Sequence, residues 1–270
     1  MKRVAVVAPS RSLDRKAAEA VKRLVETAYP DRLELAIHPQ CFAASGHFAG
    51  DDQTRAGAFI DVANDPAVDA VWFARGGYGA CRILDQVVPS LGDAAKAKTW
   101  LGYSDGGYLL AALDRAGIGR SVHGPVVADI IRADGEAAAR RALDFLAGEQ
   151  GGKEPSVGEG SAVALTLSIL ASLVAGPHVP DLKGRVLMIE EVGEHLYAID
   201  RMLYTVFSSG KIDGCAGLRL GRFNDVPEND IDFGEEPEAM VRRWCEEYEV
   251  PYLGRVDIGH DAGNKIVPFR

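Results

Sequence analysis

The change of pattern that decides the fold lies in Trp100-Leu101-Gly102-Tyr103-Ser104-Asp105-Gly106-Gly107. An apolar run ends there, and apolar residues then recur with helical spacing at Leu109, Leu110 and Leu113. This pattern predicts a strand over 99–103, a tight turn at Ser104 and a helix after it. Such a turn exposes a hydroxyl at the end of a sheet, beside the first free N–H groups of a helix. Ser104 is therefore a candidate nucleophile, and an ordinary Ser-Asp helix cap is the alternative.

Strand-like and helix-like segments alternate through the first half of the chain. Strands are expected at 3–8, 33–37 and 70–73, in addition to 99–103. Helices are expected over 17–28, where apolar residues fall on one face, and over 135–147. Alternating β and α units predict an α/β domain, flavodoxin-like or Rossmann-like, with a parallel sheet covered by helices on both faces.

A polar, glycine-rich segment separates this half from a second unit. We interpret residues 148–161 as a linker, so that 1–147 is the first domain and 162–270 a smaller β/α domain. Strands are expected there at 185–189, 216–220 and 252–258. One helix carries an apolar stripe that ends at Gly210, and another begins at Pro237 with Met240, Val241, Trp244 and Tyr248 facing inward.

Composition excludes several classes of protein. The 270 residues carry a net charge of −9 and no run of basic residues, which argues against nucleic-acid partners. The longest apolar stretch, 162–176, contains hydroxyl residues and is too short to span a membrane. The apolar core of the N-terminus is also too short for a signal peptide. Four scattered cysteines predict reduced thiols in a cytoplasmic protein with no metal site.

A serine nucleophile needs a base, and the base needs a residue that orients it. Among six histidines, His260 lies on a glycine-flanked turn after a predicted strand, where a base could be held and still be reached. His123 fits a structural or supporting position, and the other four fit loops and turns. Glu190 and Glu191 follow the predicted strand 185–189 and are candidates for the orienting acid, although an acidic loop is the alternative.

Arg75-Gly76-Gly77-Tyr78-Gly79 follows the predicted strand 70–73. Its glycines could expose backbone N–H groups to an oxyanion or a carboxylate. The spacing of nucleotide-phosphate loops is not met. Arg75 could bind a substrate carboxylate, or it could form an ion pair that holds the fold.

Five motifs occur in order: Arg75-Gly76-Gly77-Tyr78-Gly79, Gly102-Tyr103-Ser104-Asp105, His123-Gly124-Pro125, Glu190-Glu191-Val192-Gly193-Glu194 with Ile199-Asp200-Arg201-Met202-Leu203, and Gly259-His260. Together they resemble the LD-carboxypeptidases of the S66 serine peptidase group, which also includes the microcin C-resistance hydrolases. The resemblance covers nearly the whole chain.

The resemblance implies a Ser104–Glu190–His260 triad between the two domains, with oxyanion donors near Gly77 and Asp105 beside Gly76. It also implies a cytoplasmic homodimer without metal or cofactor. Its activity would be removal of the terminal D-alanine from murein tetrapeptide, at an L-to-D peptide bond, during cell-wall recycling.

Several departures from the family pattern leave alternatives open. Gly106-Gly107 stands where the family usually has Ile-Thr-type residues. The family's common Gly-Asn-Leu-Ser pattern is replaced by Leu165-Thr166-Leu167-Ser168, and its usual Pro-Asn is replaced by Gly263-Asn264. The sequence also stops at Arg270, earlier than most relatives. Glu191 competes with Glu190, because one residue of register decides between them. The alternative functions are a peptidyl- or aminoacyl-nucleotide hydrolase, a catalytically silent muropeptide-binding protein and a flavodoxin-like binding module.

Overall fold

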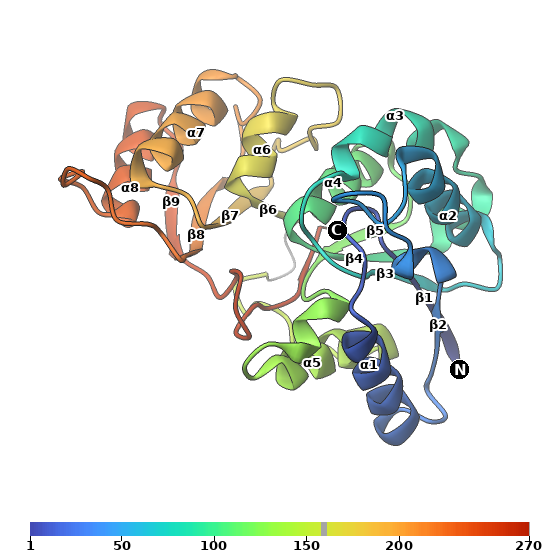
Figure 1. Ribbon diagram of the computed structural model, residues 1–270. Helices are drawn as coiled ribbons and strands as arrows, with labels where there is room; N and C mark the ends of the chain where they lie inside the picture. The colour runs from blue at the N-terminus through green and yellow to red at the C-terminus, as the bar shows by residue number, and fades with distance from the viewer. Residues whose placement is uncertain (158–160, 270) are drawn as a thin grey trace.

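The first half of the chain supplies five strands of a six-stranded sheet with helices on both faces (Figure 1). The computed structural model describes residues 1–157 and 161–269. The elements of this first lobe are β1 (Lys2–Val7), α1 (Arg15–Ala28), β2 (Leu33–Ile37), α2 (Asp52–Asn64), β3 (Ala70–Phe73), α3 (Leu84–Val87), β4 (Thr99–Gly102), α4 (Gly107–Ala116), β5 (Arg120–His123) and α5 (Gly135–Ala147). The strands and helices predicted for 1–147 are confirmed to within a few residues.

The strand order is β10-β5-β4-β3-β1-β2, and all pairs are parallel except β10 with β5. Strands β1 to β5 thus have the flavodoxin-like order, in which the chain reverses direction across the sheet between β1 and β3. Ligands of such sheets bind beyond the carboxyl ends of the strands, at this reversal point. The loops that follow β1, β3 and β4 all lie at that edge.

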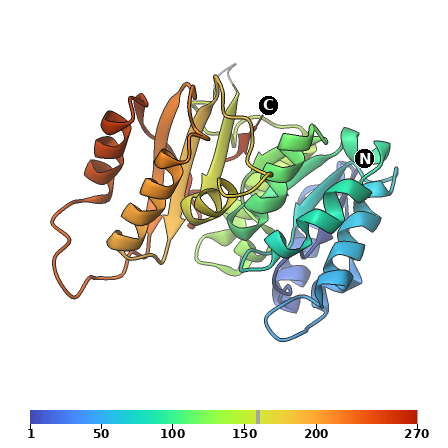
Figure 2. The same ribbon diagram turned by 90° about the horizontal axis from the view of Figure 1, so that it is seen from above.

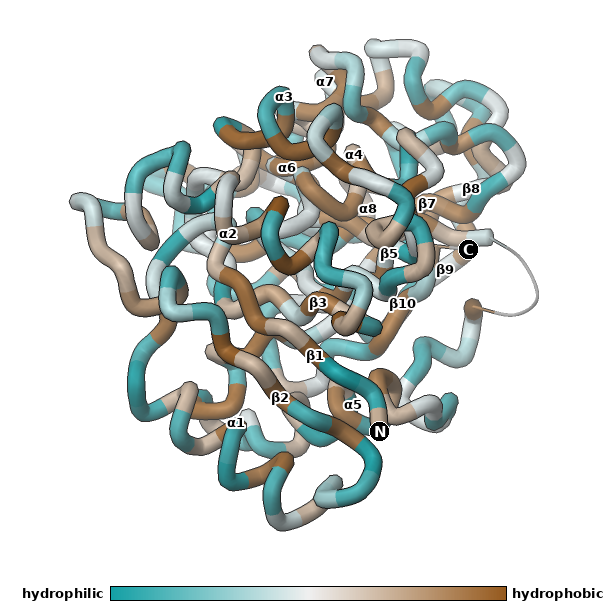
Figure 3. The backbone as a smooth tube through the Cα atoms, turned by 90° about the vertical axis from the view of Figure 1, so that its right-hand side faces the viewer, coloured by the Kyte–Doolittle hydropathy of each residue, from teal (hydrophilic) through white to brown (hydrophobic). Residues whose placement is uncertain are grey.

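Side chains of β1 point alternately into two separate hydrophobic cores. Val4 and Val6 of β1 pack with α1 and α5, whereas Ala5 and Val7 pack on the opposite side with α2, α3 and α4. This alternation is the period-two pattern of a strand that is buried on both faces. In Figure 3, brown hydrophobic segments lie along β1 and β2 of this lobe.

The second lobe is a four-stranded parallel sheet in the order β6-β7-β8-β9. Its elements are β6 (Ala162–Thr166), α6 (Leu167–Leu173), β7 (Val186–Val192), α7 (Leu196–Ser208), β8 (Gly217–Asn224), α8 (Pro237–Glu247) and β9 (Tyr252–Arg255). Helix α7 is followed by Gly210 at a positive φ of 70°, and α8 begins at Pro237, both as predicted.

Some predicted boundaries in this lobe are wrong. Strand β7 continues to Val192, so Glu190 and Glu191 lie within the strand rather than after it. Strand β8 continues to Asn224, whereas β9 ends at Arg255 instead of 258. Tyr248, expected to face inward, is 36% exposed because it lies at the end of α8. Short apolar runs locate a strand, but they do not mark where a buried polar residue continues it.

The two lobes are tied together by the last strand and by a shared core (Figure 2). Strand β10 (Val267–Pro268) returns to the first sheet and pairs antiparallel with β5, Val267 opposite His123. Arg185, before β7, forms a buried ion pair with Asp114 of α4 at 2.6 Å and donates to the Phe269 carbonyl. Of the segment 148–161 interpreted as a linker, residues 158–160 lie outside the described part, and in the described part the Glu154 N–H donates to the Ile266 carbonyl. Among the described residues, no helix is long and apolar enough to cross a membrane.

Candidate active site

Ser104 occupies the sharp turn between β4 and α4, and its backbone is left-handed, with φ at 57°. A non-glycine residue in this region is uncommon and costs on the order of 1–2 kcal/mol. Backbone strain of this kind concentrates at functional sites, and a strand-to-helix turn of this shape exposes a nucleophilic hydroxyl. The turn predicted at Ser104 is therefore present.

Residues 75–79 form a loop after β3, here called the glycine loop, which lies directly against Ser104. A Cβ atom added to Gly76 would be 2.9 Å from Ser104 Oγ and 3.9 Å from the Asp105 nitrogen, so only glycine permits this approach. Within the described part of the chain, the N–H groups of Gly76 and Gly77 donate to no acceptor. Free N–H groups beside a hydroxyl can receive an oxyanion.

The Asp105 side chain is directed away from this space, into the base of the loop. Its buried carboxylate accepts hydrogen bonds from the Ser10 hydroxyl and from the Ala80 N–H, the latter at 2.8 Å. Burial raises the pKa of this carboxyl, although these hydrogen bonds oppose the shift. Buried Arg55 donates to the Gly79 carbonyl at 2.8 Å. The glycine loop is thus fixed by two charged side chains, neither of which contacts the space above Ser104.

Asp105→Asn is expected to lower kcat by about 10- to 100-fold, because a neutral amide oxygen accepts these hydrogen bonds more weakly than a carboxylate and the loop would shift. Kinetics should show a fall in kcat with KM little changed. Ser10→Ala removes only one donor and should cost less than about 10-fold. If Asp105→Asn loses thermal stability but retains the wild-type kcat, the carboxylate does not position the loop for turnover.

Glu190 and His260 form a hydrogen-bonded pair that joins two segments of the second lobe. His260 Nδ1 lies 2.6 Å from Glu190 Oε2, and Thr166 Oγ donates to Glu190 Oε1 at 2.6 Å. Burial alone would lower the pKa of His260, but the Glu190 charge and hydrogen bond outweigh it, so that the pKa is raised. Burial conversely disfavours ionised Glu190, and the interactions with His260 lower its pKa. The pair therefore favours an imidazolium beside a carboxylate.

Glu191 does not share this contact. Successive side chains of a strand point to opposite faces. Glu191 instead accepts from the backbone N–H groups of Ser168 at 2.6 Å and Val192 at 2.9 Å. Of the two carboxylates, Glu190 is therefore the one in contact with His260.

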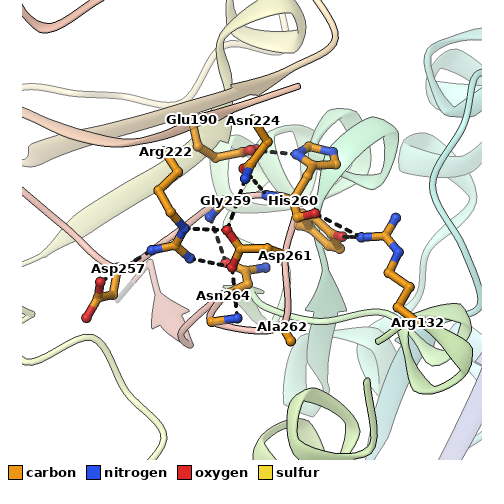
Figure 4. Close-up of polar contacts among 12 residues, drawn as sticks. Arg132, Glu190, Arg222, Asn224, Asp257, Gly259, His260, Asp261, Ala262 and Asn264 are labelled. Atoms are coloured by element: carbon orange, nitrogen blue, oxygen red, sulfur yellow. Dashed lines mark hydrogen bonds and ion pairs between the residues drawn. The ribbon is translucent and has the colours of Figure 1, made fainter. Parts of the chain in front are cut away.

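The loop that carries His260 is held by polar contacts on several sides (Figure 4). Asn224, at the end of β8, accepts from the His260 N–H at 2.8 Å and donates to Asp261 at 3.0 Å. Arg222 binds the same aspartate. Buried His123 lies 2.9 Å from the Asn264 side chain, which agrees with its predicted supporting position.

The first lobe packs against the His260 ring through Tyr103. The two ring centroids are 4.8 Å apart, and the Tyr103 hydroxyl lies 3.2 Å from Asp129. Arg132 donates to both the Tyr103 hydroxyl and the His260 carbonyl at 3.2 Å (Figure 4). Contacts from both lobes therefore fix the orientation of the imidazole.

One pocket of about 360 Å³ connects these groups. Its walls are Arg11, Asp14, Arg75, Gly76, Gly77, Tyr103, Ser104, Val126, Ala128, Asp129, Ile131, Arg132 and His260. Ser104 and His260 thus line the same space, but no hydrogen bond joins them, and buried His260 Nε2 has no partner among the described residues. An imidazole with an unpartnered nitrogen that shares a pocket with a serine hydroxyl can accept a proton from it once the two approach.

Several residues of this arrangement escaped the sequence reasoning. They include Arg11, Tyr103, Arg132, Thr166 and Asn224. Thr166 and Asn224 could have been found, because each ends a strand that neighbours β7, at the same edge of the sheet. The remaining histidines lie outside the pocket: His178 contacts Asp85 at 3.1 Å, and His195 stacks on Tyr197.

Comparisons with known proteins show the family to which the chain belongs. The LD-carboxypeptidase N-terminal domain matches residues 4–124, and the LD-carboxypeptidase C-terminal domain matches 159–270. The murein tetrapeptide carboxypeptidase of Pseudomonas aeruginosa is 29% identical over 99% of this chain and 91% of its own. A Streptomyces coelicolor relative is 32% identical over 99% of this chain and 88% of its own.

Solved structures share the fold. Muramoyltetrapeptide carboxypeptidase from Oxalobacter formigenes has a TM-score of 0.80 at 24% identity, covering 98% of this chain and 92% of its own. The microcin C7 self-immunity protein MccF has a TM-score of 0.80 at 17% identity, covering 99% and 91%. The chain belongs to the LD-carboxypeptidase (S66) family of serine peptidases, and it is a carboxypeptidase.

Proposed function

We propose that the protein removes the terminal D-alanine from murein tetrapeptide through a Ser104–Glu190–His260 triad and an acyl-enzyme. The observation that carries the proposal is the Glu190–His260 pair: His260 lines the pocket that also contains Ser104, and its buried Nε2 has no partner among the described residues. This is the nucleophile, base and orienting acid of a serine hydrolase. The relatives named as murein carboxypeptidases support the substrate.

The reaction begins when Ser104 Oγ attacks the scissile carbonyl carbon and its proton passes to His260 Nε2. Glu190 holds the imidazole by Nδ1 and stabilises its cation. The carbonyl oxygen becomes an oxyanion, which the N–H groups of Gly77 and Asp105 receive beside Gly76. The C–N bond then breaks as His260 protonates the departing amine, and water activated by the same histidine releases the acyl group from Ser104.

Proton transfer requires Ser104 Oγ and His260 Nε2 to come within hydrogen-bond distance. Such bonds are frequently long in free enzymes and shorten when substrate binds. The two residues belong to different lobes, so substrate binding must bring the two atoms together across the contact that Tyr103 and Arg132 form with His260. The resemblance to the family further implies a cytoplasmic homodimer, which light scattering coupled to gel filtration would test.

The proposed activity is tested with L-Ala-γ-D-Glu-meso-diaminopimelate-D-Ala as substrate and mass spectrometry of the products. We expect loss of one D-alanine with the wild type. Hydrolysis of an aminoacyl sulfamoyl adenosine without any release of D-alanine would replace the proposal by a nucleotide-conjugate hydrolase. Binding of the tetrapeptide without turnover would identify a silent muropeptide-binding protein.

A further inference from the structure

The active-site pocket carries an excess of positive charge that the triad does not use. Arg11, Arg75 and Arg132 all line it, on a protein whose net charge is −9. Arg132 is engaged by Asp129, Tyr103 and the His260 carbonyl. Arg11 and Arg75 form no ion pair or side-chain hydrogen bond with any residue of 1–157 or 161–269. Of the two roles considered for Arg75, a contact with a substrate carboxylate and an ion pair that holds the fold, these observations favour the contact with substrate.

Neither of the two carboxylates that line the pocket, Asp14 and Asp129, forms an ion pair with Arg11 or Arg75. Asp14 caps α1 by accepting from the Lys16 N–H at 2.7 Å. Asp129 accepts from the Val126 N–H at 2.9 Å and also binds Arg132. The pKa of Arg75 is lowered by burial first and by the charges of Arg11 and Arg132 next, although Asp14 opposes this. Two guanidinium groups held close together without a partner are a site for an anion.

The position of the two arginines follows from the topology of the first sheet. Arg11 follows β1 and Arg75 follows β3, so they flank the point at which the strand order reverses. The stem of Arg11 fills the space that a Cβ of Gly77 would occupy, which packs Arg11 against the glycine loop. Arg75 immediately precedes Gly76, where an added Cβ would lie 2.9 Å from Ser104 Oγ.

We propose that Arg11 and Arg75 form a carboxylate clamp for the C-terminal carboxylate of the departing residue. The inference rests on the proposed function. The clamp would restrict hydrolysis to the last peptide bond of the substrate. One nitrogen and one Cα separate the scissile carbonyl from a terminal carboxylate, so the anion lies within about 4 Å of the carbonyl carbon. An arginine that starts beside Gly76 is long enough to reach it. An internal peptide bond has no charge at this position and gains nothing from the clamp.

The clamp is tested by comparing the tetrapeptide acid with its C-terminal D-alaninamide, which removes the charge and keeps the scissile bond. The ratio of kcat/KM for acid over amide is measured for the wild type, Arg11→Gln, Arg75→Gln and Arg75→Lys. We expect a wild-type ratio of about 100 or more, and a loss of about 10-fold or more in each glutamine variant, mainly through KM. Arg75→Lys should recover part of the loss, because it keeps the charge without the planar fork.

Exposed Arg23 on α1 offers a matched control, since Arg23→Gln changes the same net charge away from the pocket. It should leave the ratio unchanged, and thermal melting verifies the folding of each variant. A wild type that hydrolyses acid and amide equally, or glutamine variants that retain the full ratio, would overturn the clamp alone. A wild type that hydrolyses neither substrate would overturn the proposed function, and the clamp with it.

Discussion

Ser104→Ala is expected to abolish release of D-alanine, with a loss in kcat of at least about 10⁴-fold. Without Oγ no acyl-enzyme can form, and the remaining N–H groups and arginines can only bind the substrate. The measurement is product formation by mass spectrometry over long incubation, beside wild type at equal concentration. A variant that keeps a near-wild-type rate would show that another group is the nucleophile.

Folding should survive this substitution, because the left-handed backbone at residue 104 is strained equally for serine and alanine. Ser104→Gly offers a sharper control. Glycine relieves a strain of about 1–2 kcal/mol and adds about 0.5–1 kcal/mol of unfolded-state entropy. We therefore expect an inactive variant at least as stable as the wild type in thermal melting. A clear loss of stability in Ser104→Gly would contradict the strained-turn interpretation.

Glu190→Gln is expected to lower kcat by about 10³- to 10⁴-fold, because the imidazole loses its orienting charge and can adopt the wrong tautomer. The variant also changes the pH dependence. The base must be neutral, so kcat/KM rises with pH through the pKa of His260. Glu190 raises that pKa. Removing its charge should move the acid limb of the pH profile to lower pH while the plateau falls.

Glu191→Gln is the matched control for this prediction. The adjacent carboxylate is also buried, but it binds only the Ser168 and Val192 N–H groups. Its loss should reduce thermal stability and move the acid limb to lower pH by less than Glu190→Gln does, because the charge of Glu191 also raises the pKa of His260 but less than Glu190 does. If Glu191→Gln moves the limb and Glu190→Gln does not, the two carboxylates have been assigned in the wrong order.

Local pattern determined much of this fold. The apolar runs and helical spacings located the strands of the first sheet, because burial on both faces leaves a continuous apolar signature. The change from a continuous apolar run to helical spacing of apolar residues marked the turn at Ser104. The glycine loop at Arg75–Gly79 was visible as well, since only glycine allows such close approach to Ser104.

Tertiary structure alone decided how these pieces meet. Glu190 and His260 are 70 residues apart, and their contact depends on how β7 packs beside the loop after β9. The choice of Glu190 over Glu191 depends on which face of β7 each occupies, and a shift of one residue reverses it. The return of β10 to the first sheet and the meeting of Arg11 with Arg75 depend on strand order. Local sequence carries no record of strand order, because pairing joins segments through space rather than along the chain.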